Sequence, residues 1–249
     1  MRFFAGALVL LLTACWTLTA QPVAKDLLLD VPSTDRLTYD IEWRMIHAGS
    51  AVVDEQKTSA RLKLESAGLV SSLFKVDDAY GVTYDEPFCA TSSTLDAQEG
   101  KRHRETRVTY DRSKNRADYI ERDVLKNAVL HTYDTPIPNC VHDVLGALIS
   151  LRGLTLNPGQ SAQMPVSDGH KSASVKVEAQ EREEIKTSTG TYKTIRFEPY
   201  LMNGVVYNRK GRVFIWQSDD ARRLPVQIQL RMAFPVGTVT LRLLKEEKL

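Results

Sequence analysis

One stretch of this sequence constrains the fold more than any other. Residues 140–153, CVHDVLGALISLRG, are the one long segment whose apolar residues recur at the spacing of an α-helix. The stripe consists of aliphatic residues: Val141, Val144, Leu145, Leu148 and Leu151, widened by Ile149. Asn139 suits the N-cap, and Gly153 stands where a left-handed C-cap glycine belongs. The pattern predicts a helix over residues 140–152 that needs an apolar surface to pack on.

The rest of the chain supplies that surface, because its apolar and polar residues alternate with period two. Residues 37–43 (LTYDIEW) and 224–232 (LPVQIQLRM) are the clearest examples. Asp168-Gly169 is the best two-residue hairpin turn, and Pro165 makes the strand before it an edge or end strand. Roughly a dozen strands without a long polar linker favour a mainly β domain over residues 36–249. A curved antiparallel sheet of this kind is expected to carry the helix on its concave face.

The N-terminus has the features of an export signal. Met1-Arg2 precedes an apolar run at residues 3–12, which is too short to span a membrane. We expect a signal peptide at residues 1–20, with cleavage after Ala20, and a leader at residues 21–35. The alternative is a lipobox ending at Cys15, which would be lipidated and would anchor the protein to a membrane. The protein is therefore expected to be exported, and periplasmic unless it is anchored.

The cysteine count fits an oxidising compartment. Processing at either site leaves Cys89 and Cys140, an even number, and we expect them to form a disulfide. Two unpaired buried cysteines are the alternative interpretation.

Charge and hydropathy exclude two classes of protein. The formal net charge is +2, from 33 basic and 31 acidic residues, which argues against a nucleic-acid-binding surface. No segment after the signal peptide is apolar for long enough to span a bilayer as a helix.

Catalytic motifs are absent from the sequence. It holds no G-x-S-x-G, phosphate-binding glycine loop, H-E-x-x-H or paired C-x-x-C, and its five histidines are scattered. His142-Asp143 is a conceivable acid–base pair, but adjacent helical residues diverge, so a role in the first helical turn is favoured. Neighbouring acids such as Asp77-Asp78 point to opposite faces of a strand. The sequence predicts no catalytic residues, metal site or cofactor.

Five segments together carry a resemblance to a known family. They are LTYDIEWRMIHAG (37–49), GLVSSLFKVDD (68–78), EGKRHRE (99–105), CVHDVLGALISLRG (140–153) and GRVFIWQSDDARRLPV (211–226). Read together, they resemble the bacterial domain-of-unknown-function family 3108, an uncharacterised family of exported proteins. The resemblance covers nearly all of the chain after the signal peptide. It implies a β-rich fold comparable with the curved half-barrels of lipoprotein carriers, and it brings no catalytic residues.

Function is expected to follow from the space between helix and sheet. The first hypothesis is a non-enzymatic binder or carrier of an apolar ligand such as a lipid, and the second is an envelope assembly protein acting through its surface. An enzyme is the third. The expected lining is apolar and comes from three segments: Trp43, Leu69, Leu73, Phe74, Val144 and Leu148. Residues 68–74 are read as one or two helical turns, or as a loop or strand end. The same side chains could instead form a dry core, and volume distinguishes the two, because ligand pockets reach roughly 300–1,000 Å³.

Overall fold

The structure is a computed structural model that describes residues 34–85 and 88–249. The predicted signal peptide, the cleavage site at Ala20, the lipidation site at Cys15 and most of the predicted leader lie outside these residues.

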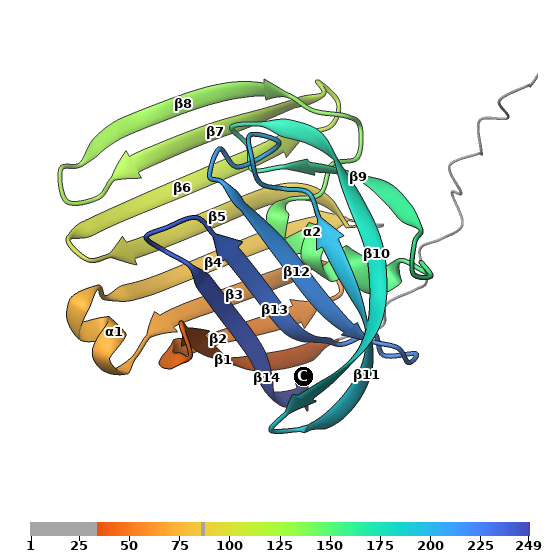
Figure 1. The fold of residues 1–249 in the computed structure, drawn as a ribbon. Coiled ribbons are helices and arrows are strands. Elements are labelled where there is room, and N and C mark those ends of the chain that lie inside the picture. Colours follow the sequence, from red (N-terminus) through yellow and green to blue (C-terminus); the bar gives the residue numbers. More distant parts are fainter. Residues whose placement is uncertain (1–33, 86–87) are drawn as a thin grey trace, which may run out of the picture.

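Within the described residues, fourteen strands form one sheet, with two short α-helices between them (Figure 1). The strands are β1 (Asp35–Trp43), β2 (Ile46–Gln56), β3 (Ser59–Ser66), β4 (Val76–Asp85), β5 (Cys89–Glu99), β6 (Arg102–Asp111), β7 (Arg116–Asp123), β8 (Ala128–Pro136), β9 (Ser161–Ser167), β10 (Ser172–Thr187), β11 (Gly190–Pro199), β12 (Gly211–Ser218), β13 (Pro225–Met232) and β14 (Thr238–Lys248). Helix α1 (Gly68–Leu73) lies between β3 and β4. Helix α2 (Val144–Ser150) lies between β8 and β9 and continues into one 3-10 turn, Leu151–Gly153.

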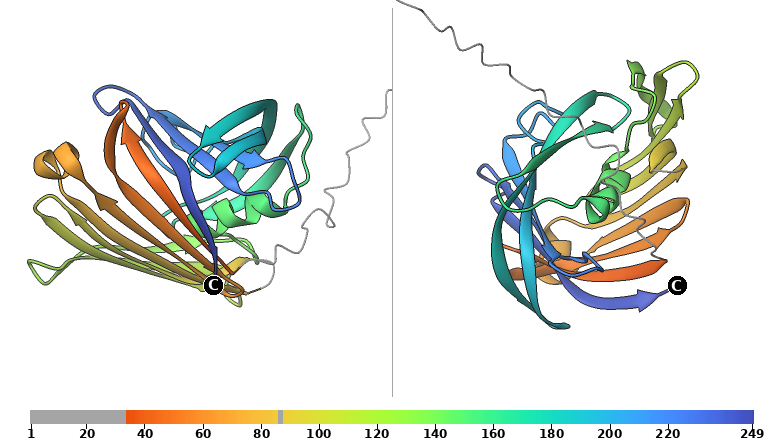
Figure 2. Two further views of the ribbon diagram at one scale, coloured as in Figure 1. Left: turned by 90° about the horizontal axis from the view of Figure 1, so that it is seen from below. Right: turned by 90° about the vertical axis from the view of Figure 1, so that its right-hand side faces the viewer.

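The sheet is antiparallel and unclosed. Each strand pairs with the next one along the chain, except that β8 and β9 form the two edges and β1 pairs with β14. Strands β1–β8, the first wing, and β9–β14, the second wing, diverge from the region of the C-terminus, which we call the closed end (Figure 2). Helix α2 lies between the wings. The predicted mainly β fold, with one curved antiparallel sheet and its principal helix inside, is confirmed.

Helix α2 begins four residues later than predicted, and its caps differ. The backbones of Val141 and His142 bond to strands on both sides instead of joining the helix. Its N-cap is Asp143, not Asn139. At the other end, the chain tightens into the 3-10 turn, and Gly153 does not adopt a positive φ. The predicted left-handed glycine cap is therefore wrong, because the Leu154 amide already bonds back to the Leu151 carbonyl at 3.0 Å.

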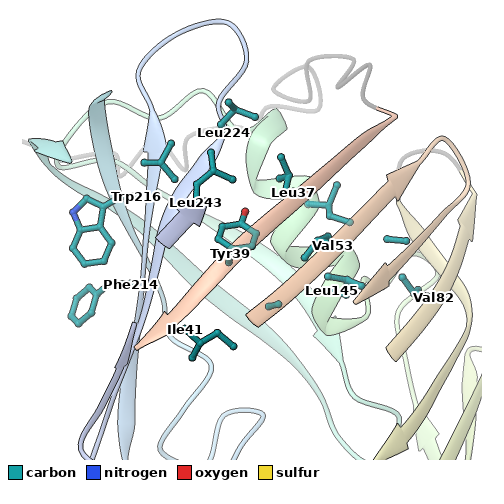
Figure 3. Close-up of a cluster of buried hydrophobic side chains, with 14 of the residues drawn as sticks. Leu37, Tyr39, Ile41, Val53, Val82, Leu145, Phe214, Trp216, Leu224 and Leu243 are labelled. Atoms are coloured by element: carbon teal, nitrogen blue, oxygen red, sulfur yellow. The ribbon is translucent and has the colours of Figure 1, made fainter. Parts of the chain in front are cut away.

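Helix α2 packs on both wings at once. Leu145 and Ile149 join the cluster that contains Leu37 and Val53 of the first wing (Figure 3). Ala147 and Leu151 join a second cluster with residues of β9 to β13. Burial of each large aliphatic side chain contributes about 1.5–3 kcal/mol to folding. The helix thus holds the two wings together from inside.

Two smaller expectations are also met. Residues 68–74 form the short helix α1, which was one of the two alternatives for this segment. Strand β9, which contains Pro165, is an edge of the sheet, as the proline predicts.

Candidate functional site

The start of α2 is fixed to the first wing by a disulfide and two hydrogen bonds. Cys140 is bonded to Cys89 at the start of β5, with 5.0 Å between their Cα atoms, so the predicted pairing is confirmed. The Ala90 amide donates to the carbonyl of Val141 at 2.8 Å. The His142 ring donates from Nδ1 to the Phe88 carbonyl at 2.8 Å. The segment before α2 therefore cannot move away from β5.

The same segment also pairs with the second wing. The His142 amide donates to Pro165 at 3.0 Å, and the Ser167 amide donates to His142 at 2.9 Å. These bonds make a short parallel bridge to β9. Residues 140–142 thus join β5 to β9 across the gap that the unclosed sheet leaves.

Asp143 caps α2 from a fully buried position. Its carboxylate accepts from the amides of Gly146 at 2.7 Å and Leu145 at 3.1 Å, and from the Tyr80 hydroxyl at 2.7 Å. Burial raises the pKa of this carboxyl group, although the three donors act against the shift. A Cβ on Gly146 would lie 2.6 Å from Oδ1 of Asp143, so glycine is needed there. The first-turn role favoured from the sequence is confirmed.

His142 and Asp143 do not form an acid–base pair. The His142 ring bonds to Phe88, whereas Asp143 turns into its own helix. Burial lowers the pKa of His142, which favours the neutral ring. Both side chains are occupied with holding α2 in place.

The far end of α2 is held by buried charges at the closed end. The Arg152 guanidinium pairs with Glu55 of β2 and with Asp35 of β1, at 3.3 Å in the latter case. The side chains of all three are at most 4% exposed. Lys248, near the C-terminus, also pairs with Asp35. These contacts fix the helix to the first wing at its second end.

The WQSDDARRLPV segment meets the same end of the helix. Ser218 and Leu224 close a loop through two 2.8 Å hydrogen bonds. The loop presents the Arg222 carbonyl, which accepts from Arg152 at 3.0 Å, and the Arg223 side chain donates to the carbonyl of Leu154. Two of the five segments that carry the family resemblance, residues 140–153 and 211–226, therefore contact each other.

Only one face of α2 retains solvent exposure. Leu145, Gly146, Ala147, Ile149 and Ser150 are buried, whereas the aliphatic Val144 and Leu148 are half-buried. These two residues are one helical turn apart and share a face. Small residues occupy buried positions because the helix lies close to β9, where Ser150 Oγ is 3.5 Å from the Met164 sulfur. Val144 and Leu148 lie on the helix face opposite Gly146 and Ser150.

Half-buried apolar side chains continue from this helix face onto both wings. The pairing registers place them all on the concave side, and they are Leu62, Leu64 and Tyr80 of the first wing and Val213, Leu230, Val239 and Leu241 of the second. Burial decreases along β1 away from the closed end: Tyr39 is 1% exposed, Ile41 7%, and Trp43 is half-buried. We call Val144, Leu148 and these seven residues the concave apolar surface.

The structure separates the six residues predicted to line a ligand site. Val144 and Leu148 belong to the concave apolar surface. Trp43 lies at the end of β1, and its Nε1 donates to the Val236 carbonyl of the β13–β14 turn at 2.6 Å.

Leu69, Leu73 and Phe74 lie apart from α2, so the structure does not bring these three predicted lining residues together with Val144 and Leu148. They are 72%, 80% and 51% exposed. Helix α1 begins beyond Ser66, at the end of β3 remote from the row of Tyr80, which contacts α2. Along β3, residues 63–67 lie between Leu62, the partner of Tyr80, and the start of α1. The predicted helical turns are present, but none of the residues of α1 is buried.

Two surface hollows have other linings. One, of about 430 Å³, lies on the convex face over Ala79 and Gly81, with Arg61 and Arg107 among its flanking residues. The other, of about 350 Å³, lies beside the β11–β12 loop. The first exists because Ala79 and Gly81 have little or no side chain, and charged residues surround it. Neither includes Val144 or Leu148.

Charged side chains elsewhere on the first wing form ion pairs and hydrogen bonds with neighbouring strands. The basic strand β6 has a cross-strand acid as a partner: Arg104 bonds to Glu121 of β7 at 2.8 Å. Asp77 pairs with Lys63, whereas Asp78 accepts from the Gln98 amide at 2.9 Å. Across residues 34–85 and 88–249, no three His, Cys, Asp or Glu side chains gather to hold a metal ion. In the same residues, no helix has the length and apolar character needed to cross a membrane.

Comparison with known protein families agrees with the resemblance found in the sequence. The model of the family described as "Protein of unknown function (DUF3108)" matches residues 38–244. The chain belongs to the DUF3108 family. The match includes the disulfide, α2 and the loop that holds Arg152, and the family resemblance predicted from the sequence is confirmed. No curated protein matches the chain.

Solved structures show a related fold at low sequence identity. A β-barrel-like protein of family DUF1849 from Brucella abortus is 8% identical, with a TM-score of 0.57. The match covers 86% of this chain and 97% of that one. A DUF1089 family protein from Pseudomonas aeruginosa is 12% identical, with a TM-score of 0.41 over 74% of this chain and 90% of the other. The first likeness supports a β-barrel-like fold for this DUF3108 protein.

Proposed function

We propose that this DUF3108 protein binds an apolar ligand, of the acyl-chain class, on the concave apolar surface. The observation that carries the proposal is the exposure of Val144 and Leu148. In a helix whose other residues are buried, these two aliphatic side chains remain half-buried and face apolar side chains of both wings. The proposal rests on this partial exposure, since neither surface hollow includes the two residues.

Three further observations support the proposal. The surface opens progressively from Tyr39 to Trp43, so a chain could enter between the wings away from the closed end. Its frame is rigid, because a disulfide and buried ion pairs hold both ends of α2. Its polar neighbours, such as Arg104 and Glu121, are paired with each other, so they do not demand a charged ligand.

The expected affinity is moderate. Each buried methylene group contributes about 0.8 kcal/mol, so about eight of them supply roughly 6 kcal/mol. That corresponds to a Kd in the range of tens of micromolar. We therefore expect saturable binding of a fluorescent fatty acid by the purified protein, with displacement by an unlabelled fatty acid.

The test is the substitution Leu148→Asn. It places an amide on the concave apolar surface and is expected to weaken probe binding about tenfold or more, because an unpaired polar group costs about 1–3 kcal/mol. Val144→Thr, which nearly preserves volume, is expected to act in the same direction. Leu244→Asn is the control, since Leu244 is an exposed leucine of β14 that joins neither core cluster.

Circular dichroism establishes that each variant is folded before binding is compared. Equal probe affinity in the wild type, Leu148→Asn and Val144→Thr would show that ligand binding does not use this surface. Absence of any saturable binding to the wild type would refute the proposed function itself.

A further inference from the structure

Large exposed apolar side chains gather at one edge of the molecule. Five turns form this edge, which we call the rim: β1–β2, β3–β4 with α1, β5–β6, β7–β8 and β13–β14 (Figure 1). The described part of the chain has fourteen large apolar residues with exposed side chains, and nine lie in or next to these turns. They are Met45, Ile46, Leu69, Leu73, Phe74, Val124, Leu125, Val129 and Phe234. Met45 and Phe234 are 92% and 90% exposed.

The rim is held together by contacts between its turns. The Arg44 amide donates to Thr238 at 3.2 Å, which joins β1–β2 to β13–β14. The Ala67 amide donates to Ala48 at 2.8 Å, which joins α1 to β2. The Gly100 amide donates to Lys75 at 2.7 Å, which joins β5–β6 to the end of α1. The apolar tips therefore belong to one continuous edge.

Basic residues accompany the apolar tips. The five turns contain four basic residues (Arg44, Lys75, Lys101 and Lys126) and no acidic one, and the adjoining strand ends add Arg102, Glu99 and Asp123. Asp123 already pairs with Lys126 at 3.4 Å. The rim thus combines exposed apolar side chains with an excess of positive charge, although the net charge of the whole chain is only +2.

The closed end of the first wing offers a comparison within the same molecule. Its β2–β3 and β6–β7 turns, like the β12–β13 loop beside them, contain none of the fourteen exposed large apolar residues. The five exposed residues outside the rim all belong to the second wing or the C-terminus: Tyr200, Val205, Tyr207, Leu244 and Leu249. The first wing thus exposes its large apolar residues at one end only, and exposed apolar surfaces of this kind mark interaction sites.

We propose that the rim is a docking surface for an anionic lipid bilayer. The turn tips would insert into the boundary between headgroups and acyl chains, while the lysine and arginine side chains meet lipid phosphates. Separate tips along a curved edge suit a deformable lipid surface better than a rigid protein partner. The inference is independent of the proposed ligand, because the rim can bind a bilayer whether or not the concave apolar surface is occupied.

Vesicle co-sedimentation tests the proposal. The protein is taken as its host exports and processes it, and its intact mass establishes that all variants share one N-terminus. We expect binding to vesicles of phosphatidylcholine mixed with phosphatidylglycerol, and weaker binding to phosphatidylcholine alone. Met45→Ser, Leu73→Ser and Phe234→Ser in one chain should lower the partition coefficient about fivefold each, roughly 100-fold together.

Charge reversal tests the contribution of the basic residues of the rim. Lys75→Glu with Lys101→Glu should weaken binding to the anionic vesicles by at least about 25-fold, since each basic residue near such a surface contributes roughly a factor of five. Added salt should weaken wild-type binding in the same direction.

Two control proteins carry equivalent changes away from the rim. Leu244→Ser with Leu249→Ser removes two exposed leucines, and Lys186→Glu with Lys193→Glu reverses two exposed lysines of the β10–β11 hairpin. Both should bind vesicles like the wild type. Rim variants that bind as tightly as these controls, or a wild type that binds neither vesicle, would overturn the proposal. Probe binding by the same proteins reports separately on the ligand.

Discussion

At the scale of single residues, buried polar groups around the start of α2 hold the helix in place. Asp143 has three donors and no exposed surface, and the glycine three residues later leaves room for its carboxylate. Burial also raises the pKa of Tyr80, which keeps its hydroxyl protonated as a donor to Asp143. Each group is satisfied by a neighbour, as buried polar groups must be.

The lowered pKa of His142 predicts how the free energy of unfolding depends on pH. Burial lowers its pKa in the folded state, so the unfolded chain binds the proton more readily. The stability that the neutral His142 ring contributes is fully present above a pH of about 6.5, the pKa of histidine in the unfolded chain. It is lost as the pH falls from there toward the lower pKa of the folded state. The free energy of unfolding should decrease with falling pH in this window, by at most about 1.4 kcal/mol per pH unit.

Denaturant titrations at several pH values between about 5 and 7 measure this slope. His142→Asn should reduce it, whereas His131→Gln, at an exposed position of β8, should leave it as in the wild type. A slope that is the same in His142→Asn and the wild type would contradict a buried neutral ring.

At the scale of elements, α2 shows which part of a helix a sequence can reveal. Its apolar spacing correctly predicts that a helix exists and is buried. Its start cannot be read from spacing, because residues 140–142 bond instead to β5 and β9, which are distant in sequence. Asn139 and Asp143 are both acceptable caps locally, and only these tertiary bonds select Asp143.

The charged cluster at the end of α2 makes a second prediction. Arg152→Met leaves Asp35 and Glu55 buried with one positive charge fewer, so we expect a loss of about 3–5 kcal/mol in the free energy of unfolding. Arg222→Met is the matched control. The Arg222 side chain is 51% exposed where it pairs with Asp220, so the loss should stay below about 1 kcal/mol.

Urea unfolding of both variants compares the two losses. Similar stability in the two variants would mean that the buried cluster does not fix α2 to the first wing.

At the scale of the whole molecule, the pattern of alternation and the family resemblance predicted a curved antiparallel sheet, and the cysteine count predicted the disulfide. The structure does not bring three of the six predicted lining residues to the helix. Leu69, Leu73 and Phe74 have helical spacing, which in most chains indicates burial, but they stand at the rim. Helical spacing shows that residues share one face of a helix. It cannot show whether that face packs against the protein or is exposed.

The position of Leu69, Leu73 and Phe74 connects the two proposals. These three residues belong to the rim, together with Met45 and Phe234. A bilayer docked at the rim would lie next to the half-buried side chains of both wings. An acyl chain could then pass between membrane and protein without crossing water.

The most direct test of ligand binding is lipid mass spectrometry of the protein purified without detergent. The account predicts that organic extracts of the wild type contain an acyl-chain lipid in near-stoichiometric amount, and that extracts of Leu148→Asn contain much less. Leu244→Asn should retain the wild-type amount. A wild type that carries no lipid, or a lipid content unchanged in Leu148→Asn, would contradict binding on the concave apolar surface.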